Sequence, residues 1–168
     1  SRERRIVTDF EIRPRLTPSG EGSQKETPRL LTDEQLSALK SFEQQIPGTA
    51  MLLWGVTGSG KTEVYLQLLA NELAQGRSCL VLTPEIGLIP QLVDRCRKRF
   101  GEVVFEYHSG CSDLERIRTW QQTLMTQDPL VIVGTRSAVF LPLSPLGLIV
   151  LDEEHDNSYK QDSPMPCY

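Results

Sequence analysis

Residues 51–62 read MLLWGVTGSGKT, a short apolar run that opens into a glycine-rich turn ending in Lys61 and Thr62. Gly55 and Gly60 bracket four residues, so the backbone can turn tightly and place several N–H groups around a phosphate with no Cβ in the way. Apolar side chains at positions 64, 66, 68, 69 and 73 then predict an amphipathic helix from Lys61 to about Ala74. Because a helix N-terminus favours an anion, the stretch predicts a phosphate-binding loop between a buried strand and a helix.

The residue types in this loop indicate a nucleoside triphosphate and Mg²⁺ as ligands. Lys61 is predicted to reach the β- and γ-phosphates as a flexible point charge, and the Thr62 hydroxyl is placed to ligate Mg²⁺. The other predicted nucleotide-binding positions of the loop are Gly55, Gly58, Ser59 and Gly60. The alternative is a chance glycine-rich turn between a strand and a helix. A match at every fixed position, with suitable flanks on both sides, favours the phosphate loop.

Composition is that of one globular domain of ordinary size, with 168 residues, 39% hydrophobic and 24% charged. The net charge of −4 argues against a uniformly basic nucleic-acid binder but is compatible with a local basic groove. Four cysteines, at positions 79, 96, 111 and 167, lack zinc-ligand spacing and are expected to be reduced thiols. With no apolar run of membrane-spanning length and no signal-like N-terminus, we expect a cytoplasmic protein with no membrane partner.

The first 30 residues differ from the rest in composition. They are rich in arginine, proline and glycine without periodicity, which predicts a linker or the end of a preceding domain, with 6–12 as a possible strand. The arginines there either touch nucleic acid or are simply solvated. Residues 31–168 are expected to form a single lobe, truncated at its C-terminus.

The remaining pattern alternates helices with almost continuously apolar strands. Strands are expected at 78–82, 103–107, 130–133 and 146–151, and helices after Thr32, from Lys61 and over 112–126. A further helix is expected with Thr83 as N-cap and Pro84 at its first position, interrupted at Pro90. This order predicts an α/β fold: a mostly parallel sheet with helices on both faces and ligands beyond the carboxyl ends of the strands.

Two further positions fit a nucleotide site. Asp152 follows the apolar strand and would hold Mg²⁺, while Glu153 would orient and deprotonate the attacking water. Gln35 lies about twenty residues before the loop, where an amide could read adenine; a capping box with Thr32 would also explain it. His108 is expected to be structural rather than catalytic.

Several blocks of sequence resemble a known group. Asp152-Glu153-Glu154-His155 is similar to the DExH box of superfamily 2 helicases. More narrowly, the chain from about residue 31 onward resembles the bacterial primosomal helicases, which restart stalled replication forks. The blocks that carry this resemblance, in order, lie at 55–65, 84–91, 108–110, 134–138 and 152–161.

The resemblance implies the N-terminal RecA-like P-loop NTPase lobe of an ATP-driven 3′-to-5′ DNA helicase. It implies single-stranded and forked DNA, primosome proteins and single-strand-binding proteins as partners of a monomer, with zinc bound only outside this chain. Residues implied to contact DNA or to couple it to the nucleotide are Thr83, Pro84, Thr135, Arg136, His155 and Tyr159. Tyr168 is a second candidate aromatic in the loop that Tyr159 would begin.

The chain departs from this family pattern by lacking a second lobe, and hence its arginine finger. We therefore expect weak nucleotide binding, slow or absent hydrolysis and no unwinding. Two alternatives are a P-loop nucleotide kinase-like enzyme and a protein-binding module with a vestigial loop. The Asp-Glu-Glu-His box argues against the kinase-like enzyme. The protein-binding module is disfavoured because Lys61, Thr62, Asp152 and Glu153 are all intact.

Overall fold

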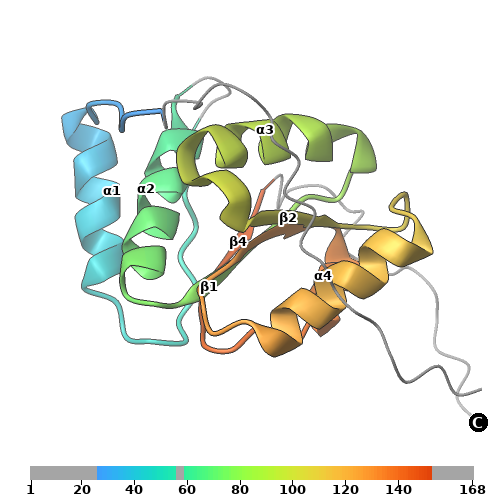
Figure 1. The fold of residues 1–168 in the computed structure, drawn as a ribbon. Coiled ribbons are helices and arrows are strands. Elements are labelled where there is room, and N and C mark those ends of the chain that lie inside the picture. Colours follow the sequence, from blue (N-terminus) through green and yellow to red (C-terminus); the bar gives the residue numbers. More distant parts are fainter. Residues whose placement is uncertain (1–25, 56–58, 153–168) are drawn as a thin grey trace, which may run out of the picture.

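A computed structural model describes residues 26–55 and 59–152, and these form a parallel sheet with helices on both sides (Figure 1). The strands are β1 (Ser78–Leu82), β2 (Val104–Tyr107), β3 (Val131–Gly134) and β4 (Leu146–Leu151), in the order β2-β3-β1-β4. All three pairings are parallel, with Leu80 opposite Ile132 on β3 and Ile149 on β4. The predicted α/β class is therefore confirmed.

The helices cover the two faces of the sheet unequally. They are α1 (Asp33–Glu43), α2 (Lys61–Ala74), α3 (Ile89–Phe100) and α4 (Asp113–Met125). Helices α2 and α3 bury their apolar side chains against one face, and α1 packs on the outside of α2 (Figure 1). Helix α4 lies on the opposite side and contacts β2, beside a second core formed with residues 138–143.

Local sequence accounts for most helix boundaries. Thr32 caps α1 with a complete capping box: its hydroxyl accepts from the Gln35 N–H at 3.3 Å, and the Gln35 side chain accepts from the Thr32 N–H at 2.9 Å. Ser112 and Glu115 form the same motif at the start of α4. Gly101 ends α3 with φ 75°, a left-handed conformation that glycine adopts without strain.

Two expectations about local structure were wrong. Residues 51–54 do not form a strand, because they share no ladder with β4, and Trp54 is 87% exposed. Thr83 and Pro84 do not open a helix either: a 3₁₀ turn at Ile86–Leu88 intervenes, and α3 begins at Ile89 with Pro90 in its first turn. Pro90 suits that position because its missing N–H would have no intrahelical partner there.

The described cysteines behave as the spacing predicts. Cys79, Cys96 and Cys111 are free thiols, and burial raises the pKa of both Cys79 and Cys96 to about 12. Both thiols are therefore protonated and unreactive at neutral pH. Within residues 26–55 and 59–152, no helix combines the length and apolar character needed to cross a bilayer.

Candidate nucleotide site

The phosphate loop meets α2 at a position that requires glycine. Gly60 is the N-cap residue with φ 81°, and a Cβ built on it would lie 2.2 Å from the Gln35 amide nitrogen. Lys61 is the first residue of the helix, and its Nζ donates to the Gly55 carbonyl at the other end of the loop. The Lys61 side chain therefore reaches residue 55, and its contact with phosphate stays a prediction.

Gln35 joins α1 to the same loop. Its side-chain nitrogen donates to the Ser59 carbonyl at 3.0 Å while its oxygen accepts the Thr32 N–H, so the predicted capping role is confirmed. An amide nitrogen carries two hydrogens, so contact with Ser59 leaves room for a second acceptor such as an adenine nitrogen. Adenine contact stays a prediction.

Asp152 lies directly beyond β4, where the sheet brings it close to α2. Its N–H donates to the Leu82 carbonyl at 2.8 Å, which continues the pairing of β4 with β1. Its Oδ2 accepts a hydrogen bond from the Tyr65 hydroxyl at 3.4 Å, and Tyr65 lies one helical turn after Thr62. The fold thereby brings the two predicted Mg²⁺ ligands, Thr62 and Asp152, to one end of the sheet.

Thr62 also contacts α3. Arg95 donates to the Thr62 hydroxyl at 3.4 Å from an exposed position on that helix. Hydroxyl and carboxylate oxygens are the hard ligands that Mg²⁺ prefers, and phosphates and waters normally complete its shell, so this donor set fits the predicted ion. Sequence reasoning missed Arg95 and Tyr65; the three-residue spacing of Tyr65 from Thr62 could have indicated the latter.

A comparison with known protein families places these residues in a helicase family. A family model described as DEAD/DEAH box helicase matches residues 32–164. The chain belongs to the DEAD/DEAH box helicase family. The matched range contains Lys61, Thr62 and Asp152, so the site described above lies inside the helicase domain.

Curated relatives of this helicase domain carry the name replication restart protein PriA. The protein of Synechocystis is 61% identical over 118 residues, which is 70% of this chain and 14% of that protein. The Bacillus subtilis protein is 45% identical over 147 residues, 86% of this chain and 18% of that protein. The Haemophilus influenzae protein is 53% identical over 110 residues, which is 66% of this chain and 15% of that protein. The chain therefore spans less than a quarter of these relatives, and the primosomal resemblance read from the motifs is confirmed.

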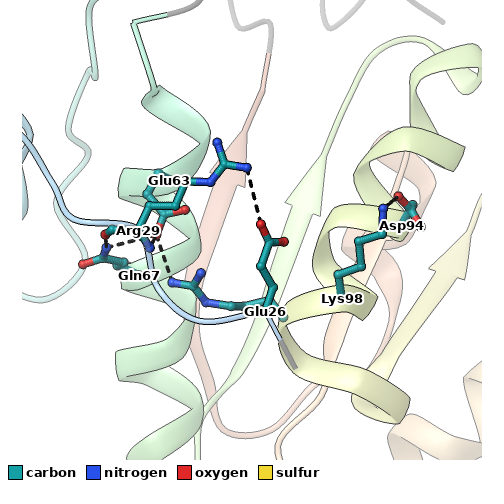
Figure 2. A network of polar contacts seen from close by, with 7 residues as sticks. Glu26, Arg29, Glu63, Gln67, Asp94 and Lys98 are labelled. Carbon is teal, nitrogen blue, oxygen red and sulfur yellow. Dashed lines mark hydrogen bonds and ion pairs between the residues drawn. The ribbon is translucent and has the colours of Figure 1, made fainter. Parts of the chain in front are cut away.

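A polar network fixes the start of α2 in the helicase domain (Figure 2). The Oε1 of Glu63 accepts from the Arg99 guanidinium at 2.9 Å, from Gln67 at 3.0 Å and from the Arg29 N–H at 3.2 Å. Burial alone would raise the pKa of Glu63, but hydrogen bonds from Gln67 and Arg99 outweigh it and lower that pKa below its usual value. Glu63, the residue after Thr62, is thus a partly buried anion that is hydrogen-bonded to α3 and to the segment before α1.

The segment before α1 is itself held against the helicase domain. The N–H of Glu26 donates to the Lys98 carbonyl on α3 at 2.8 Å, and Gln67 on α2 donates to the Arg29 carbonyl at 3.1 Å. Figure 2 shows this segment passing between the two helices, with the Arg29 side chain turned toward Glu26. Residues 26–29, expected to be part of a linker, are exposed but hydrogen-bonded to α2 and α3.

The residues expected along a DNA path differ in exposure. Thr83 and Thr135 follow the neighbouring strands β1 and β3, and the Thr83 N–H donates to the Gly134 carbonyl at 3.0 Å. The Thr83 side chain is fully buried, contrary to a surface role, and its hydroxyl has no hydrogen-bond partner among the described residues. Pro84 and Thr135 are half-buried and Arg136 is exposed, so those three keep accessible surface at this edge.

His108 has the structural role that was expected of it. Its Nδ1 accepts from the Gly110 N–H at 3.1 Å in the turn after β2, and its side chain is mostly buried. The other predicted positions, Gly58, Glu153, His155, Tyr159 and Tyr168, lie outside the described residues, as does the possible strand at 6–12.

Proposed function

We propose that this chain is the ATP-binding lobe of a 3′-to-5′ DNA helicase or translocase that acts in replication restart in the bacterial cytoplasm. One observation carries the proposal: Lys61 and Thr62 begin α2 beside Asp152 at the end of β4, within a DEAD/DEAH box helicase domain. The bacterial relatives named replication restart protein PriA support the biological role.

In this function each residue has a separate task. The N–H groups at the start of α2 and the Lys61 ammonium bind and orient the β- and γ-phosphates. Thr62 and Asp152 would hold Mg²⁺, which neutralises developing charge on the phosphates when it is bound. Glu153 would accept the proton of the attacking water, and Gln35 would bind adenine.

DNA and protein partners belong to the same proposal. Pro84, Thr135 and Arg136 would contact the phosphates of a single strand, with Thr83 supporting them from the core, and His155 and Tyr159 would couple DNA to the nucleotide state. Forked DNA, primosome proteins and single-strand-binding proteins are the proposed partners of the whole protein, and any zinc would bind outside this chain.

The 168-residue chain is expected to bind ATP yet to hydrolyse it slowly, with no stimulation by single-stranded DNA. The reason is that related NTPases gain about 10³- to 10⁵-fold in kcat from an arginine supplied by another unit. Phosphate release should be measured with and without a single-stranded oligonucleotide, beside binding of a fluorescent ADP analogue displaced by ATP.

The Lys61→Ala variant is the control in both assays, because it removes the charge that meets the phosphates. Binding that ATP displaces and that Lys61→Ala lacks supports the proposal. A turnover that rises many-fold with DNA would contradict the expected need for a second lobe. Failure of the unaltered chain to bind any nucleotide would contradict the proposed function itself.

A further inference from the structure

The hydroxyl of Tyr65 lies between the two predicted Mg²⁺ ligands. Tyr65 is only 6% exposed, and its ring packs in the core with residues of α2 and α3. Its hydroxyl reaches Oδ2 of Asp152 at 3.4 Å and also forms a hydrogen bond with the Thr62 side chain. The buried Tyr65 side chain therefore contacts both predicted Mg²⁺ ligands: Thr62 on its own helix and Asp152 directly after β4.

The direction of these hydrogen bonds follows from charge. The phenol carries the hydrogen of this pair, since a tyrosine side chain is protonated at neutral pH and an aspartate carboxylate only accepts. A protonated phenol beside a carboxylate donates to it. The phenol has one hydrogen, which points to Asp152, so in its hydrogen bond with Thr62 the phenol oxygen accepts and the Thr62 hydroxyl donates.

Arg95 begins a series of hydrogen bonds that ends at Asp152, and each group in it donates to the next. Its guanidinium donates to the Thr62 oxygen at 3.4 Å, Thr62 donates to Tyr65, and Tyr65 donates to Asp152. Each hydroxyl thus accepts one hydrogen bond and donates another, which satisfies both groups in a partly buried setting. The Asp152 carboxylate receives the last donor and is held on the side facing α2.

We propose that Tyr65 is a positioning residue for the Mg²⁺ site: its hydroxyl fixes Thr62 and Asp152 relative to each other before nucleotide binds. The inference rests on the proposed function, because it concerns the metal of the same site. Thr62 and Asp152 lie 90 residues apart in the chain, and Tyr65 links them through side-chain hydrogen bonds. Partners outside the metal's own ligands typically change metal affinity about 10- to 100-fold by orienting those ligands.

The test is the Tyr65→Phe variant of the 168-residue chain, which keeps the buried ring and removes only the hydroxyl. ADP affinity is measured by calorimetry in Mg²⁺ and again in EDTA, and the ratio of the two affinities reports the contribution of the metal. We expect this ratio to fall about tenfold in the variant, while affinity in EDTA stays unchanged. A role in packing alone would instead lower both affinities by the same factor.

Tyr107→Phe is the matched control. Tyr107 is a tyrosine of similar burial, 7% exposed, on β2 in the second core, so its substitution should leave the ratio unchanged. A ratio that stays unaltered in Tyr65→Phe, whether both affinities are kept or both fall by the same factor, would overturn the inference. Absence of ADP binding by the unaltered chain in either medium would overturn the proposed function and the inference together, an outcome distinct from an unaltered ratio.

Discussion

Arg99→Met is expected to lower the free energy of unfolding by about 1.5 to 3 kcal/mol, because it removes a charge-assisted hydrogen bond to the partly buried Glu63 carboxylate. The side chains of Arg99 and Glu63 are only 6% and 13% exposed, so solvent replaces little of the lost interaction. Methionine retains the length of the buried stem, which limits the loss of packing. Urea unfolding at neutral pH, followed by circular dichroism, measures the change.

Lys98→Met provides the control one residue away on α3. Lys98 pairs with Asp94 at 2.7 Å, but both side chains are about 60% exposed, and Figure 2 shows the pair on the outside of the helix. Exposed pairs contribute about 0 to 1 kcal/mol, so this variant should unfold almost as the unaltered chain does. Equal losses in the two variants would show that the lower exposure of the Arg99–Glu63 pair does not strengthen it.

The same pair predicts a dependence on pH. The pKa of Glu63 is lower in the folded chain than its ordinary value of 4.5, so its contribution to stability is present above that value. The contribution should diminish as the pH falls below about 4.5 toward the lowered pKa of the folded state. In Arg99→Met the corresponding loss between neutral and acidic pH should be smaller.

Gly60→Ala is expected to cost about 3 to 4 kcal/mol of stability, from two sources. The left-handed φ of 81° costs a non-glycine residue about 1 to 2 kcal/mol. The new Cβ would also force the Gln35 amide away from Ser59 and from the Thr32 cap, and each hydrogen bond lost contributes about 1 kcal/mol. Thermal and urea unfolding of the variant measure the sum.

Gly76→Ala separates these two sources. Gly76 has nearly the same φ, 75°, but nothing lies within 4 Å of the position a Cβ would take. Its substitution should therefore cost only the backbone strain. Combining Gly60→Ala with Gln35→Ala should remove the steric part, so that the second change costs less in the Gly60→Ala background than alone. Additive losses would show that Gln35 does not meet Gly60.

Sequence patterns predicted most of the fold because its determinants are local. The capping boxes at Thr32 and Ser112 and the apolar strands are each specified by a few neighbouring residues. The errors arose where the outcome depends on distant partners. Residues 51–54 are apolar enough for a strand, but a strand needs a neighbouring ladder, and β4 pairs only with β1 among the described residues.

The candidate site was predictable in its ligands but not in its supporting contacts. Lys61, Thr62 and Asp152 belong to motifs with fixed spacing, whereas Arg95 reaches Thr62 from a helix 33 residues further along the chain. The burial of Thr83 could not be predicted from the sequence either, because a threonine after an apolar strand can lie at a surface edge or in the core. Only the packing of β1 between β3 and β4 decides between them.

An amide ¹H–¹⁵N NMR titration with ADP and Mg²⁺ tests whether this chain holds a preformed nucleotide site. We expect chemical-shift changes concentrated at Gly60, Lys61, Thr62 and Asp152, and their disappearance in Lys61→Ala, whose remaining spectrum should show an intact fold. Unchanged shifts in the unaltered chain, or changes centred on α4 at the other side of the sheet, would contradict it.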